Sequence, residues 1–180
     1  MHKLFYKIFY YIDRIDKSHL EKLDKKIHLI FRNYEIIPKK KDLQELRIIT
    51  KKKGIKLYLA QDYKLAISLG FDGVYLPSFN NLLIKKNTNK KNFLILGSAH
   101  NIQELKIKEK QGVDFIFISP IFNTKNKRGI GITRFNQLLN TTSSRIIALG
   151  GINQLNLKKL PSTKIDGFAS INYIKKKYAS

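Results

Sequence analysis

The sequence predicts an α/β protein, a small (β/α)8 TIM barrel that forms one domain over residues 1–180. Three observations predict this fold. Short apolar runs recur along the chain, segments with helical spacing separate them, and the runs are apolar throughout instead of alternating. Strands that are apolar on both faces are typical of a parallel sheet wrapped by helices. The chain is shorter than the ~200 residues at the low end for such barrels, so an open, doubly wound sheet is the structural alternative.

Each predicted strand is a run rich in Ile, Leu, Phe or Tyr. The eight runs lie at residues 4–12, 27–31, 55–60, 73–76, 93–97, 115–119, 145–149 and 167–171. Between the runs, apolar residues three and four positions apart, often followed by Gly or Lys, predict amphipathic helices. These lie at residues 17–26, 39–54, 62–70, 101–112, 134–140 and 154–161. The order of the elements is therefore a repeated β-α unit.

Composition narrows the classes of function. The formal net charge of +22 would suit nucleic acid, but most of the cations are lysines spread over the whole chain, as on solvated helix faces. Phosphorylated small molecules are the favoured partners and nucleic acid is the less favoured one. The chain has no cysteine, which excludes thiolate chemistry and fits a cytoplasmic location. The N-terminus lacks the pattern of a signal peptide, and no apolar run is long enough to span a membrane.

Candidate ligand-binding residues follow the strands. In both possible folds ligands bind at the carboxyl ends of parallel strands, so those ends meet at one rim. Cations, hydroxyls, glycines and a carboxylate together indicate a phosphate site instead of an acid/base pair. The residues are Arg32, Gln61, Asp62, Ser78, Asn80, Ser98, Ala99, His100, Thr124, Lys127, Gly150, Gly151, Ser170 and Asn172.

Two of these groups have clear phosphate chemistry. Glycine lets the backbone approach a ligand closely, so Gly150 and Gly151 in ALGGIN predict a phosphate cradle or, equally, a tight turn. A hydroxyl from Thr124 and an ammonium from Lys127 could hold a diphosphate and neutralise the charge that grows on it as it leaves. The alternative for this second group is a basic surface loop.

Two further residues have a structural and a chemical interpretation. His100 could act as a general base near neutral pH or serve as a structural hydrogen-bonding group. Asp62 could bind Mg²⁺ or cap the helix predicted at residues 62–70.

Four stretches match motifs of one known family, in the same order along the chain. They are GFDGVYLPSFN, LGSAHNIQEL, GVDFIFISPIFNTKNK and IIALGGIN, which are similar to that family's Gly-Ala-Asp-Gly-Val-His-Leu, Gly-Val-Ser-Ala-His, Gly-Pro-Val-Phe-x-Thr-x-x-Lys and Ala-Ile-Gly-Gly-Ile segments. The chain thus resembles the thiamine phosphate synthase/thiazole tautomerase (TenI-like) family of small barrels, from about residue 5 to residue 174.

The resemblance implies a transferase of thiamine biosynthesis. It would join hydroxymethylpyrimidine diphosphate to thiazole phosphate, with Mg²⁺ as cofactor, and release diphosphate. It also implies the following roles: Arg32 and Lys127 hold the diphosphate, Ser98 lines the diphosphate side and Asp62 binds Mg²⁺. Substrate-binding roles are implied for Thr124, Gly150, Gly151, Ser170, Ile171, Gln61 and His100.

The sequence departs from the family pattern at several site positions. Ile30 and Tyr34 replace the Gln and Lys that flank the arginine, and Asn80 replaces a second metal carboxylate. These changes predict weaker diphosphate binding. The alternatives are a thiazole phosphate tautomerase, in which His100 would substitute for a histidine replaced here by Pro120, and a non-catalytic phosphate-ligand or nucleic-acid binding barrel.

Overall fold

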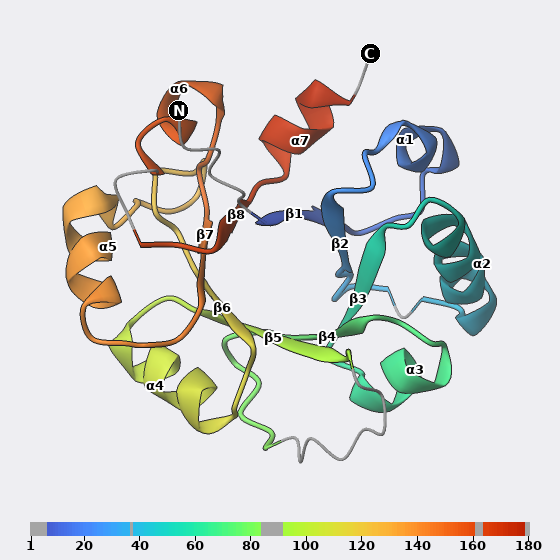
Figure 1. Cartoon of the computed structure of the whole chain (residues 1–180), viewed down its shortest axis with the longest axis horizontal. Coiled ribbons are helices and arrows are strands. Elements are labelled where there is room, and N and C mark those ends of the chain that lie inside the picture. Colours follow the sequence, from blue (N-terminus) through green and yellow to red (C-terminus); the bar gives the residue numbers. More distant parts are fainter. Residues whose placement is uncertain (1–6, 37, 84–91, 161–163, 179–180) are drawn as a thin grey trace.

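Eight parallel strands close into a barrel in the computed structural model, which describes residues 7–36, 38–83, 92–160 and 164–178 (Figure 1). Each strand pairs with the next along the chain, and β8 pairs back with β1. The closed barrel is thereby confirmed, and the open sheet is excluded. The strands are β1 Lys7–Ile12, β2 Ile27–Phe31, β3 Lys56–Ala60, β4 Gly73–Leu76, β5 Leu94–Ala99, β6 Phe115–Ile118, β7 Ile146–Leu149 and β8 Gly167–Ala169.

Helices surround the strands on the outside of the barrel (Figure 1). The described ones are α1 Lys17–Lys22, α2 Lys40–Lys52, α3 Tyr63–Ser68, α4 Ile102–Lys110, α5 Gly131–Leu139, α6 Gln154–Leu157 and α7 Asn172–Lys177. All six predicted helices are present, although most are shorter than predicted. Helix α7 was not predicted, because its single buried residue, Ile174, gives little periodicity before three consecutive lysines.

The connection from β4 to β5 lacks a helix within its described residues, 77–83 and 92–93. Two side chains of α4 and the turn after it hold its first part. The Lys108 ammonium donates to the carbonyl oxygens of Pro77 (2.8 Å) and Asn80 (2.6 Å) and to the Gln111 side chain (2.9 Å). Gln111 in turn donates to the carbonyl oxygens of Asn80 and Leu82. Polar side chains of a neighbouring helix thus satisfy backbone groups that a helix would otherwise pair internally.

The strands are buried on both faces, as the continuous apolar runs predicted. Alternate residues such as Phe9, Tyr58, Tyr75 and Phe117 fill the barrel interior. The intervening residues pack against the helices in two outer clusters. This double burial explains why the strand sequences do not alternate between apolar and polar residues.

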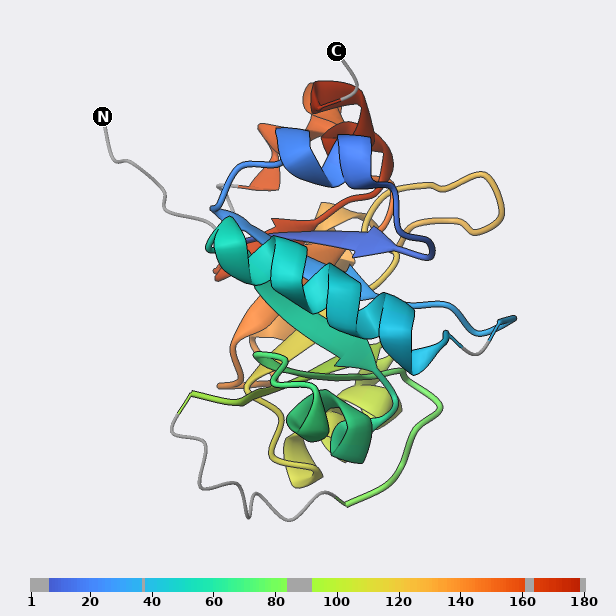
Figure 2. The same cartoon turned by 90° about the vertical axis from the view of Figure 1, so that its right-hand side faces the viewer.

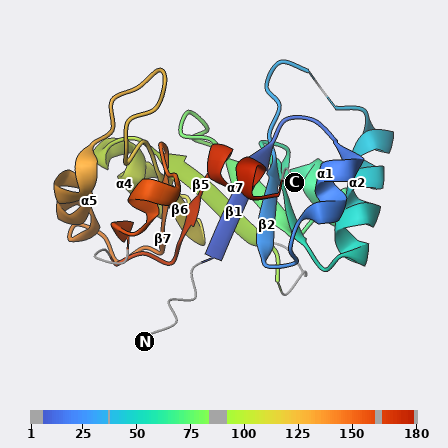
Figure 3. The same cartoon turned by 90° about the horizontal axis from the view of Figure 1, so that it is seen from above.

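The carboxyl ends of the strands define one side of the barrel. The loops that follow β2 and β6 both project on this side (Figures 2 and 3). Site residues at strand ends therefore face a common rim, as in other parallel barrels. Among the helices in the described ranges, none has the length and hydropathy required to cross a bilayer.

Candidate functional site at the barrel rim

Arg32 lies directly after β2, where its backbone N–H donates to the carbonyl oxygen of Ile12 (2.8 Å). Its guanidinium carbon lies 4.6 Å from the ring centre of Tyr11 and 5.6 Å from that of Tyr34. No carboxylate in the described part of the chain forms an ion pair with it. Aromatic rings orient a guanidinium without neutralising it, so Arg32 keeps its charge for an anionic ligand.

Tyr34 extends this arrangement outward. Its ring meets that of Phe79, from the connection after β4, edge to face at 5.8 Å. Burial and the nearby Tyr75 raise the pKa of Tyr34 to about 12, against a smaller opposite effect of Arg32. The phenol is therefore a neutral hydrogen-bond donor at physiological pH, in the position where the family pattern has a lysine.

The double-glycine turn after β7 requires glycine at both positions. Gly150 and Gly151 have φ angles of +94° and +68°. A Cβ on Gly150 would lie 2.6 Å from the Pro120 Cα, and one on Gly151 would lie 2.5 Å from the Asn123 carbonyl oxygen. The tight-turn interpretation is therefore confirmed, since the missing side chains make room for the neighbouring chain at Pro120 and Asn123. The phosphate cradle stays a prediction for this turn.

The loop after β6 carries the predicted hydroxyl and cation. The Thr124 hydroxyl accepts from the Lys127 N–H (3.0 Å) and lies 3.1 Å from the Lys127 carbonyl oxygen, so it closes a turn within the loop. Thr124, Lys125, Lys127 and Arg128 are all exposed. Lys127 forms no ion pair with any residue in the described ranges. The structure thus gives Thr124 a role in shaping the loop and leaves the Lys127 ammonium exposed to solvent.

Ser98 and Ser170 are both buried, with exposed fractions of 4% and 5%. Ser98 lies within β5, not after it as predicted. The Ser170 hydroxyl donates to the Ile152 carbonyl oxygen (2.8 Å), which ties the end of β8 to the segment after the double glycine. Ile171, by contrast, is exposed and lines a cavity together with Arg32.

Gln61, Asp62 and Asn80 line one cavity of about 550 Å³ with Leu76. The Asp62 carboxylate accepts from the Leu65 N–H (2.8 Å) and caps α3, so the predicted capping role is present. Gln61 is held with φ of +69°, a conformation uncommon outside glycine. The fold thus brings together three residues that were predicted to lie at the carboxyl ends of neighbouring strands.

A bound Mg²⁺ would find few protein ligands here. One Asp62 oxygen caps α3, which leaves the other, and the Asn80 amide oxygen accepts from the Leu82 N–H (3.0 Å). Within the described ranges, no three His, Asp or Glu side chains are grouped closely enough to hold a metal ion. Mg²⁺ is often bound through one carboxylate plus substrate phosphates. The residues therefore fit a Mg²⁺ that is shared with a diphosphate, but not a protein cage.

His100 follows β5 and lies against the first turn of α4. Its N–H donates to Glu104 (2.8 Å), and its Nδ1 lies 2.9 Å from the same carboxylate oxygen. Asn101 caps the same helix through the Glu104 N–H. His100 is thus part of the start of a helix, which corresponds to its predicted structural interpretation.

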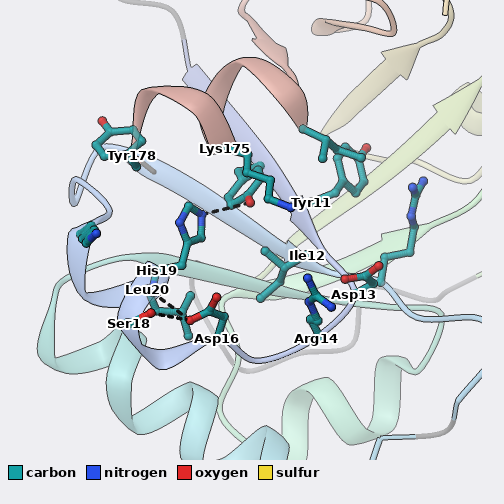
Figure 4. Close-up of a pocket in the computed structure, with 14 residues that line it drawn as sticks. Tyr11, Ile12, Asp13, Arg14, Asp16, Ser18, His19, Leu20, Lys175 and Tyr178 are labelled. Atoms are coloured by element: carbon teal, nitrogen blue, oxygen red, sulfur yellow. Dashed lines mark hydrogen bonds between the residues drawn. The ribbon is translucent and has the colours of Figure 1, made fainter. Parts of the chain in front are cut away.

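The sequence analysis missed rim residues that have no distinctive motif. Tyr11 and Arg32 line a cavity of about 480 Å³ together with Lys175 of α7 (Figure 4). Tyr75, in the barrel interior, meets the Tyr11 ring edge to face at 5.4 Å. Tyrosines inside apolar strands look like ordinary core residues, so only their position at the carboxyl ends of β1 and β4 could have pointed to them.

The fold and the rim define a (β/α)8 barrel protein with an anion-compatible site at the carboxyl ends of its strands. The chain belongs to the thiamine monophosphate synthase family, whose sequence model matches residues 22–174. The resemblance predicted from the four motifs is thereby confirmed.

Individual relatives agree with this family. The chain is 38% identical over 85 residues to a putative thiamine-phosphate synthase 2 of Aquifex aeolicus, which covers 46% of this chain and 45% of the relative. It is 33% identical over 104 residues to a thiamine-phosphate synthase of Halalkalibacterium halodurans, and this match covers 57% of this chain and 46% of the relative. The matched part of this chain thus spans less than half the length of each of these curated relatives.

A solved structure shows the same fold over nearly the whole length. Thiamine phosphate pyrophosphorylase from Pyrococcus furiosus superposes with a TM-score of 0.73 and 21% identity, over 96% of this chain and 92% of that chain. At this identity the likeness supports the barrel fold alone.

Proposed function

We propose that the chain is a thiamine-phosphate synthase, a transferase that acts on small phosphorylated substrates. It would transfer the pyrimidinylmethyl group of hydroxymethylpyrimidine diphosphate to thiazole phosphate. The bond from the methylene carbon to the diphosphate breaks, a bond from that carbon to the thiazole forms, and thiamine monophosphate and diphosphate result. Family membership supports the reaction class, and the rim supplies the groups that the reaction needs.

The observation that carries the proposal is the state of Arg32. A leaving diphosphate gains negative charge as its bond to carbon breaks, so a fixed cation that faces it lowers the barrier. Arg32 is fixed by two aromatic rings at 4.6 and 5.6 Å and lines the cavity at the rim. A guanidinium can hold two phosphate oxygens at once through its parallel N–H donors.

The other groups complete the proposed site. Lys127, on its exposed loop, contributes a second cation to the diphosphate, and Ser98 lines the same side. The Gly150–Gly151 turn binds the thiazole phosphate through the backbone, with Ile171 beside it. Three predicted substrate-binding side chains take a positioning role, since Thr124 shapes its loop, Ser170 ties β8 to the glycine turn and His100 lies at the start of α4.

Mg²⁺ is proposed to arrive with the diphosphate and to be held by Asp62. When bound, it would supply further charge neutralisation of the leaving group. Asp62 offers the carboxylate oxygen that does not cap α3, and Gln61 keeps Asp62 at the rim through its own N–H, which donates to the Tyr75 carbonyl oxygen (2.8 Å). The reaction is proposed to take place in the cytoplasm, a location that the absence of cysteine supports.

The test is formation of thiamine phosphate from both substrates and Mg²⁺ by the purified protein, with an established synthase assayed in parallel. We expect product from the wild-type protein and a loss of at least tenfold in kcat/KM for Arg32→Lys, which keeps the charge but loses the planar pair of donors. Absence of product alongside an active reference enzyme would refute the proposal.

The two alternatives are separable in the same preparation. A tautomerase would convert thiazole phosphate in the presence of EDTA and would lose that activity in His100→Ala. A nucleic-acid binding barrel would bind RNA with a steep dependence on salt concentration that Lys127→Ala barely changes. The contacts of His100 with α4 do not favour the first, and the even spread of lysines does not favour the second.

A further inference from the structure

Tyr11 occupies an unusual place at the barrel mouth. It is the last inward-facing residue of β1 and is 3% exposed. Its ring packs edge to face against Tyr75 at 5.4 Å and Phe117 at 6.1 Å. These contacts fix the ring, so its hydroxyl has a defined direction.

The Tyr11 hydroxyl has no hydrogen-bond partner. Among the buried side-chain nitrogen and oxygen atoms of the described residues, it is the one atom in this state. After burial, the largest influence on Tyr11 is the Tyr75 phenol, which raises the pKa of Tyr11 further through its charge and a hydrogen-bonding contribution. The two hydroxyls are thus near neighbours, but their distance and angle do not make a regular hydrogen bond. A buried hydroxyl without a partner costs roughly 1–3 kcal/mol, and such groups in folded proteins are rare enough to need an explanation.

The cavity next to Tyr11 suits an anion. The Arg32 guanidinium carbon lies 4.6 Å from the centre of the Tyr11 ring. Both residues line the cavity of about 480 Å³. Figure 4 shows Tyr11 of β1 and Lys175 of α7 among the side chains around it. The charged residues that line it are Arg14, Lys22, Arg32 and Lys175 against Asp13 and Asp16, so cations outnumber carboxylates. Asp16 is already engaged as the N-cap of α1.

We propose that Tyr11 is a ligand-binding residue, whose hydroxyl donates a hydrogen bond to an oxygen of the phosphate group that Arg32 holds. The bond would satisfy the orphaned hydroxyl only when the ligand is present. The identity of the phosphate as a diphosphate rests on the proposed function, but the anion site itself does not.

The neighbouring tyrosines give this site a distinct chemistry. Tyr34 and Tyr75 stand where the family pattern has lysine and histidine. Tyr34 lies beside Arg32, and Tyr75 lies against Tyr11. Burial keeps the phenols of Tyr11 and Tyr34 protonated, because it raises both pKa values. The residues near Arg32 therefore include neutral phenols, and the site carries less positive charge than the family pattern would give. A hydrogen bond to a charged partner is roughly twice as strong as one between neutral groups, so the phenols can offset part of the lost charge.

The experiment compares two Tyr→Phe variants by calorimetric titration with inorganic pyrophosphate at fixed ionic strength. Tyr11→Phe should weaken pyrophosphate binding roughly tenfold or more, the loss expected for a hydrogen bond to a charged group. Its melting temperature should not fall, because the wild-type hydroxyl has no partner to lose. Tyr58→Phe is the matched control: Tyr58 is equally buried in the barrel interior, but its hydroxyl is paired with the His28 Nδ1 at 3.1 Å. This variant should lose thermal stability and keep its affinity for pyrophosphate.

Three results would overturn the proposal: wild-type affinity in Tyr11→Phe, a fall in its melting temperature as large as that of Tyr58→Phe, or no pyrophosphate binding by the wild-type protein. The proposed function fails separately. If pyrophosphate binding depends on Tyr11 but the protein forms no thiamine phosphate, the synthase assignment is wrong and the role of Tyr11 stands. If the wild-type protein forms thiamine phosphate but Tyr11→Phe binds pyrophosphate with unchanged affinity, the role of Tyr11 is wrong and the synthase assignment stands.

Discussion

We expect the free energy of unfolding of the wild-type protein to rise between about pH 8 and pH 10.5. The variant Lys108→Met should lack this rise. Lys108 is 0% exposed, and its ammonium donates to three neutral oxygens at 2.6–2.9 Å with no carboxylate among them. Burial lowers its pKa from 10.5 to about 8, against a smaller opposite effect of Glu104. The Lys108 side-chain carbons pack beside Gly97. Methionine has a side chain of similar length without a charge, so it keeps this packing and removes the titrating group.

The sign follows from proton binding. In the pH window between the folded and unfolded pKa values, the unfolded state binds more protons than the folded one, so the free energy of unfolding rises with pH. For a folded pKa near 8 and an unfolded one near 10.4, the rise from pH 7.5 to pH 10 is about 2 kcal/mol. Well below pH 8 the lysine is charged in both states and contributes no slope.

The assay is urea unfolding of the wild-type protein, Lys108→Met and Lys110→Met at both pH values. Lys110 lies on the same helix but is exposed, so its replacement should keep the wild-type slope. Other titrating groups are common to all three proteins and cancel in the difference between wild type and variant. An equal change with pH in the wild-type protein and Lys108→Met would show that burial does not control the charge of Lys108.

Three shorter predictions concern the rim. Asp62→Asn should reduce the dependence of turnover on Mg²⁺ while unfolding stays within about 0.5 kcal/mol of wild type, because Asn caps a helix as well as Asp; a large loss of stability in urea titrations would contradict this. Lys127→Ala should lower kcat/KM at least severalfold without a change in melting temperature, since the side chain is exposed; if the variant unfolds, Lys127 is structural. Tyr34→Lys should tighten pyrophosphate binding severalfold at low salt, an effect that 0.5 M NaCl should largely abolish; equal affinity of the two proteins would mean that residue 34 does not face the anion.

The candidate site was predictable where a motif lies at a strand end. Arg32, Asp62 and the double glycine could be placed on one rim because parallel strands share a direction. For Asp62 and His100 the sequence offered the structural role found in the fold as one of two interpretations, but spacing alone could not choose between them. The turn that the Thr124 hydroxyl closes was not predicted, because it depends on a loop conformation that sequence spacing does not fix. Tyr11 was missed for a different reason, since a tyrosine in an apolar strand has the same pattern whether or not its hydroxyl finds a partner.

The sequence by itself determined a helix-covered parallel sheet, because eight continuously apolar runs separated by amphipathic helices can bury both strand faces only in such a sheet. It also determined the family through four ordered motifs. Only the tertiary structure decided that the strands close into a barrel and which side chains surround Arg32. It also decided that the Lys108 ammonium hydrogen-bonds the backbone of the connection after β4. These features arise from contacts between residues far apart in the chain, such as Tyr11 with Tyr75, and local periodicity carries no information about them.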